Sequence, residues 1–95
     1  METIYKYPLE VADEQLVTLP LHAKILSVKN QREKLVMYAE VDSETIVTYR
    51  VRIYIIGTGN PRHVPKGAIF LNTVIMAGGN LVWHVYAKKD WEGLI

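Results

Sequence analysis

The longest alternation of apolar and polar residues runs over residues 44–56, with the sequence ETIVTYRVRIYII. One parity carries Thr45, Val47, Tyr49, Val51, Ile53 and Ile55. A period of two with many β-branched and aromatic residues is typical of a half-buried strand. Because thirteen residues are long for a strand, we expect a bend or a bulge within it.

Six further stretches have the pattern or the bounding residues of strands. They are residues 3–9, 14–20, 23–30, 34–42, 69–76 and 81–88. Between the last two, Gly78-Gly79-Asn80 accepts positive φ and gives the clearest hairpin signal in the chain. The turn residues Asp42 and Ser43 predict another hairpin, in which residues 34–42 pair with residues 44–56.

These elements predict an all-β fold of six or seven antiparallel strands, in a small sandwich or a partly open barrel. No long stretch has a 3.6-residue apolar period, and residues 10–15 provide at most one short helical turn. Pro8 suits an edge strand, since proline cannot donate to a ladder. We expect a single β domain over residues 1–88 and an apolar C-terminal tail over residues 89–95.

Composition narrows the class of protein. Hydrophobic residues make up 49% of the chain and charged residues 22%, the balance of a folded globular domain. The net charge of +1 lacks the basic excess of a nucleic-acid-binding protein, which disfavours nucleic acid as a partner. There is no cysteine, and no apolar run approaches the roughly 20 residues that span a bilayer. We therefore expect a cytoplasmic protein without a membrane segment.

The segment GTGNPRH, which follows the longest strand, is the best candidate for a binding site. Its candidate residues are Gly57, Thr58, Gly59, Asn60, Arg62 and His63. It is not a phosphate-binding loop of a known kind, because Arg62 replaces the third glycine and no helix follows. We favour an ordered exit from the strand. The alternative is a loop whose N–H groups, with Arg62 and His63, contact a partner or an anion.

No catalytic constellation or metal site is recognisable in the sequence. His22, His63 and His84 lack the spacing of metal ligands, so we expect neither a metal nor another cofactor. There is no nucleophile elbow, and the adjacent carboxylates of Asp13 and Glu14 would point in different directions. We therefore expect a protein that is not an enzyme.

Two other features are candidates for binding. Arg50 and Arg52 share one face of the longest strand, as in a nucleic-acid platform. The alternative, favoured by the near-zero net charge, is a solvated face in which they pair with Glu40 or Glu44. The tail contains Trp91, which would either help to cap the core or dock on a second subunit or a partner.

Four motifs together resemble a family of small uncharacterised proteins encoded by phages and prophages. They are IYKYPLE, LPLHAKILSV, RIYIIGTGNP and LVWHVY. Proteins of this family open with an I-Y-K-Y-like strand, carry a G-T-G-[HN]-like loop and end with a [VF]-[WF]-H-V-[FY] strand. The likeness covers residues 3–87, with Asn60 where the pattern has histidine and a tail beyond Lys88 that exceeds the usual length. The resemblance implies an accessory protein that blocks a host protein or sequesters a signalling nucleotide.

These observations favour a non-enzymatic, phage-encoded protein in the host cytoplasm that binds and modulates or inhibits a host protein, including one of anti-phage defence. Sheet edges, the 57–63 loop or the tail would make the contact. One alternative is a homodimer or larger oligomer that acts as a sponge for a nucleotide-like anion, held by Arg62 and His63. Another is a nucleic-acid-binding β domain that uses Arg50 and Arg52.

Overall fold

A computed structural model describes residues 1–90 as seven strands and one short 3-10 turn. The elements are β1 (Glu2–Pro8), β2 (Glu14–Pro20), β3 (Lys24–Gln31), β4 (Lys34–Asp42), β5 (Thr48–Gly57), β6 (Ile69–Met76), η1 (Ala77–Gly79) and β7 (Leu81–Asp90). Neighbouring strands in both sheets are antiparallel. The predicted all-β fold is confirmed.

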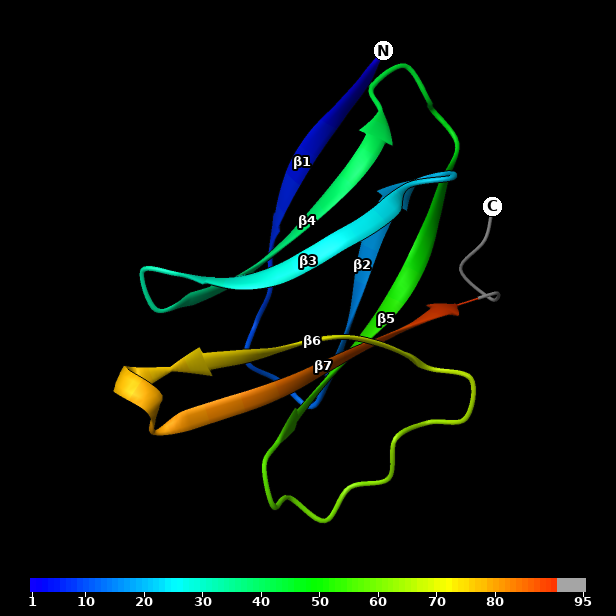
Figure 1. Cartoon of the computed structure of the whole chain (residues 1–95). Coiled ribbons are helices and arrows are strands. Elements are labelled where there is room, and N and C mark those ends of the chain that lie inside the picture. The colour runs from blue at the N-terminus through cyan, green and yellow to red at the C-terminus, as the bar shows by residue number, and fades with distance from the viewer. Residues whose placement is uncertain (91–95) are drawn as a thin grey trace.

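The strands form two sheets that stack as a sandwich and do not close into a barrel (Figure 1). The first sheet has the order β1-β4-β3, and the second has the order β2-β5-β7-β6. Because β5 and β6 are both antiparallel to β7, they are parallel to each other. Residues 58–68 must therefore return along the sheet as a crossover connection. This crossover contains most of the loop that the sequence marks as a candidate site.

The core lies between the two sheets, and strand alternation determines which side chains enter it. The predicted inward parity is confirmed for β5, and β4 and β7 also direct alternate residues into the core. The buried core residues of these strands are Leu35, Met37, Ala39, Val41, Tyr49, Val51, Ile53, Ile55, Val85 and Ala87. Their removal from water is the main force that holds the sheets together.

The predicted hairpin between residues 34–42 and 44–56 is wrong. β4 pairs with β1 and β3, whereas β5 lies in the other sheet. Thr45 N–H does donate to the Asp42 carbonyl at 3.0 Å, which closes a turn. The chain then crosses between the sheets, so the strand begins at Thr48, and its ladders show no register shift. Turn residues specify a change of direction but not the sheet that the next strand joins.

Residues 10–15, which the sequence allows at most one helical turn, form none. The Gln15 side-chain amide accepts from Glu10 N–H at 2.9 Å and donates to the Glu10 carbonyl at 2.7 Å. A side chain thereby satisfies the backbone groups that a helical turn would have used. The 3-10 turn lies instead in the β6–β7 hairpin.

The last strand is longer than predicted. Lys89 and Asp90 belong to β7 rather than to the predicted tail.

One edge of the sandwich is closed by side-chain amides that join β6 to β3. Val28 N–H donates to Asn72 Oδ1 at 2.8 Å, and Asn72 Nδ2 donates to the Val28 carbonyl at 2.6 Å. The Asn72 amide thus satisfies the β3 backbone as a neighbouring strand would. Asn30 Nδ2 adds a bond to the Ile75 carbonyl at 3.1 Å.

Both strands at this edge are bulged close to the amide bonds. The ladder between β3 and β4 skips Leu26, and the ladder between β6 and β7 skips Leu71. A bulge bends its strand and increases the local twist. The two sheets are therefore both bent and cross-linked at the same place.

The outer face of β5 is also largely buried. Tyr54 and Ile56 lie on that face and outside the core cluster, yet they are only 7% and 8% exposed. The first sheet covers the inner face of β5.

We predict that Asn72→Ala lowers the free energy of unfolding by about 1–3 kcal/mol, because it leaves the half-buried N–H and C=O of Val28 without partners. Urea denaturation measures the change. Asn80→Ala is the matched control, since Asn80 is exposed and no side-chain hydrogen bond is found for it among residues 1–90; it should change stability by less than about 0.5 kcal/mol. Equal effects of the two substitutions would contradict the bridging role of Asn72.

Candidate functional site

The predicted loop begins at the end of β5, where Gly57 packs on Trp83 of β7. A Cβ atom on Gly57 would lie 3.1 Å from Trp83 Cζ3, so a larger residue would push against the indole. Thr58 Oγ1 lies 2.8 Å from His84 Nε2, and Thr73 Oγ1 lies 3.0 Å from His84 Nδ1. Each ring nitrogen of His84 is thus engaged by a hydroxyl, and the start of the loop is fixed to β7.

The middle of the loop is fixed by Arg62. Its Nη1 donates to the Asp13 carbonyl at 2.9 Å and lies 3.3 Å from the Asp13 carboxylate. The same carbonyl accepts from Ile55 N–H at 3.2 Å, so the guanidinium holds the loop against the start of β2. Of the other predicted loop residues, Gly59, Asn60 and His63 are exposed. The loop residues therefore do not converge on one point: Thr58 contacts β7, and the Arg62 guanidinium is bonded to Asp13.

The basic face on β5 is also internally paired in part. Arg52 lies 3.5 Å from the Glu14 carboxylate and 3.3 Å from that of Asp90, on the strands at either side. The partners are therefore not Glu40 or Glu44, which belong with the first sheet and the connection after it. Arg52 therefore fits the favoured alternative of a solvated face with cross-strand ion pairs, although its partners differ from the predicted ones. The Arg50 guanidinium forms no hydrogen bond or ion pair within residues 1–90.

The sequence predictions for Trp91 concern a residue outside the described part of the chain. Within residues 1–90, no group of three or more His, Cys, Asp or Glu side chains is arranged to hold a metal ion. No helix in this part has the length and apolar character needed to cross a membrane.

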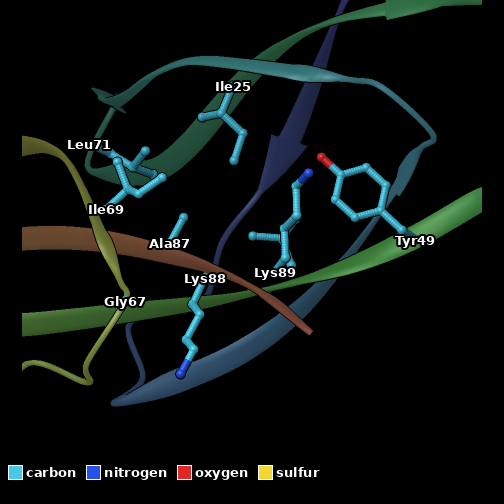
Figure 2. Close-up of a pocket in the computed structure, with 9 residues that line it drawn as sticks. Ile25, Tyr49, Gly67, Ile69, Leu71, Ala87, Lys88 and Lys89 are labelled. Atoms are coloured by element: carbon cyan, nitrogen blue, oxygen red, sulfur yellow. The ribbon is translucent and has the colours of Figure 1, made fainter. Parts of the chain in front are cut away.

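An apolar cavity of about 540 Å³ opens between the sheets beside the bulged edge (Figure 2). It is lined by Ile25, Tyr49, Val51, Gly67, Ile69, Leu71, Ala87, Lys88 and Lys89. The strands contribute mainly aliphatic side chains, and Gly67 at the end of the crossover completes the rim. This volume falls in the range of cavities that accept small molecules or anchoring side chains.

Two lysines and a tyrosine add polarity to the cavity. Figure 2 shows Lys89 directed toward Tyr49 and Lys88 directed away from it. Lys89 Nζ lies 5.7 Å from the centre of the Tyr49 ring, within the range of a cation–π contact. Tyr49 donates its hydroxyl proton to the Ala23 carbonyl at 3.2 Å, and burial raises the pKa of Tyr49, which keeps the hydroxyl protonated near neutral pH.

The mouth of the cavity carries an unusual amount of exposed apolar surface. Ile69 is 69% exposed although it lies on the inward parity of β6, and the adjacent Phe70 is also exposed. Phe70 meets Tyr86 edge to face on the outer side of the sheet. Sequence reasoning missed this site, because its lining comes from four strands and a loop that are far apart in the chain. The one local signal is the apolar pair that opens the IFLNTVIM strand without alternating.

Residues 1–93 match the family model for a domain of unknown function, DUF7352. The match includes both sheets, the crossover and the cavity. No curated protein and no solved structure matches the chain. A function therefore has to be inferred from the cavity and the surfaces described above.

We predict that Arg62→Ala loosens the crossover without unfolding the sandwich. Losing the bonds to Asp13 should cost about 1 kcal/mol of unfolding free energy, because the guanidinium is partly solvated, and should speed proteolytic cleavage between residues 58 and 68. Limited proteolysis with mass spectrometry locates the cuts. Lys66→Ala, an exposed cation in the same loop, is the control and should leave cleavage unchanged. An Arg62 variant as resistant as the wild type would show that the loop is held by other contacts.

Proposed function

This chain belongs to the DUF7352 family, and we propose that it is a non-enzymatic protein that binds a protein partner through the cavity between its sheets. The observation that carries the proposal is the open apolar cavity with the exposed Ile69 at its mouth. The partner would insert an aromatic or branched aliphatic side chain there. Buried anchors of this kind supply most of the energy of protein interfaces.

Charge at the rim supports a partner whose anchor is flanked by acidic residues. Lys88 and Lys89 line the cavity and are both exposed. Rim cations steer an acidic partner toward the site and mainly increase the rate of association. The alternatives gain less support, because Arg62 is engaged by Asp13 and Arg52 by Glu14 and Asp90. An anion sponge and a nucleic-acid platform would each need those guanidinium groups.

The resemblance to phage- and prophage-encoded proteins supports a host protein as the partner, bound in the host cytoplasm. Blocking such a protein requires affinity and surface coverage rather than chemistry. A rigid sandwich with a preformed cavity suits that task, since little conformational entropy is lost on binding.

We predict that Ile69→Asp abolishes capture of the partner, whereas Ile75→Asp does not. Both isoleucines are exposed, 69% and 59%, and both lie on β6, but only Ile69 lines the cavity. A buried aspartate without a partner group would oppose insertion of an apolar anchor, so affinity should fall at least about tenfold. Wild-type and variant proteins are used as baits in host lysate, and the captured protein is then titrated in purified form by calorimetry.

Three results would count against the proposal. The first is that the Ile69→Asp and Ile75→Asp variants capture the same host protein equally well. The second is that the wild-type chain captures no host protein. The third is a stabilising shift of the melting temperature by mono-, di- or cyclic nucleotides, which would favour the sponge instead, because a ligand of the folded state raises stability by mass action.

A further inference from the structure

β1 is an edge strand whose second side has no neighbour among residues 1–90. Two bonds that continue its ladder with β4 define which backbone groups face inward: Leu9 N–H donates to the Leu35 carbonyl, and Ser43 N–H donates to the Met1 carbonyl. The two residues that β1 contributes to these bonds, Met1 and Leu9, are both odd-numbered. Since backbone groups alternate in an antiparallel ladder, Glu2, Ile4 and Lys6 direct their N–H and C=O groups away from β4.

The other strand edges differ from this one. β3 and β6 face each other and are joined by the Asn72 and Asn30 amides. β2 is also open on one side, and its even-numbered residues direct their backbone groups outward, because Asp13 and Leu21 make the bonds that continue its ladder with β5. If β2 paired with itself about Leu16, Glu14 would face Thr18, so no opposite charges would meet.

β1 is complementary to itself in one antiparallel register. With Ile4 opposite Ile4 of a second copy, Glu2 of each copy lies opposite Lys6 of the other. All three residues have their side chains on the outer face of the sheet and their backbone groups directed to the new neighbour. Moving the register by two residues in either direction, or pairing the strands in parallel, removes at least one of these opposite-charge pairs.

Side-chain exposure on β1 fits the same contact. Ile4 is 56% exposed and Tyr5 41%, which is a large apolar area for an edge strand. Glu2 is exposed, and within residues 1–90 the Lys6 ammonium donates to the exposed Gln31 amide at 3.2 Å, a bond that water can replace. Natural edge strands usually carry features that prevent pairing. Here Pro8 lies beyond the residues that pair in this register, and the charges of Glu2 and Lys6 are opposite in sign and match those of a second copy.

We propose that β1 is a self-association edge, where a second copy of this chain adds antiparallel with Ile4 on the two-fold axis and Glu2 opposite Lys6. The two three-stranded sheets become one continuous sheet. The interface is isologous, as in most homodimers, and it is independent of the cavity and its proposed partner.

A charge swap tests the register, using the full chain in sedimentation-equilibrium experiments from micromolar to millimolar concentration. Glu2→Lys and Lys6→Glu each place like charges opposite one another, so each should weaken dimerisation at least about tenfold. The double variant Glu2→Lys/Lys6→Glu should restore the wild-type dimer. An equimolar mixture of the two single variants should form a heterodimer, because each then supplies the charge that the other lacks.

A backbone variant tests the edge itself. Ile4→Pro removes an outward N–H and no bond to β4, so the monomer should fold while the dimer is lost. Leu16→Pro makes the same change on the open edge of β2 and should leave the dimer intact. Circular dichroism checks that both variants fold; if either does not, the charge swap decides alone. A wild-type chain that stays monomeric at millimolar concentration would overturn the proposal, as would single variants that dimerise normally or a double variant that does not recover.

Discussion

The amide of Asn72 holds the two sheets together at one edge, and much of the molecule depends on that contact. It occupies the N–H and C=O of Val28 at 2.8 and 2.6 Å, in place of a strand that neither sheet supplies. Without it, β3 and β6 would be two open edges, which invite pairing with other chains. The bond is side chain to backbone, so it joins the two sheets at this edge while each keeps its own strand ladder.

The cavity follows from the same contact. The bulges at Leu26 and Leu71 lie directly beside the Asn72–Val28 bridge, and Ile25 and Leu71 line the cavity from opposite sheets. The cavity therefore lies where both strands bend, next to the bridge between the sheets. A preformed apolar site of this kind is what a rigid binding protein needs, whereas the arginines predicted to bind anions are mostly used to hold strands and loop in place.

Strand positions and their inward parities could be read from the sequence, because alternation reports burial on each strand separately. Strand pairing could not, as the hairpin wrongly predicted at Asp42 shows: β4 is saturated by β1 and β3, a fact that no local pattern contains. The cavity could not be predicted from the sequence for a similar reason, because Ile25, Val51 and Ile69 come together only in the folded chain. The Asn72 bridge has a local sign in IFLNTVIM, where a polar residue interrupts an apolar run. Because Asn72 is half-buried, its amide needs hydrogen-bond partners, and the opposite sheet supplies them through Val28.

β1 and the cavity lie at opposite edges of the first sheet, with β4 between them. Two copies joined at β1 would therefore keep both cavities open, at the far ends of one continuous sheet. From β3 to β3 there are five strand spacings, which place the two β3 strands roughly 24 Å apart. A single cavity buries one anchor and cannot by itself cover a standard interface. Two cavities at a fixed separation would bind a symmetric partner with an effective concentration that multiplies the affinity of each site. The self-association edge and the cavity are independent in structure, yet together they would let a chain of 95 residues bind a larger assembly tightly.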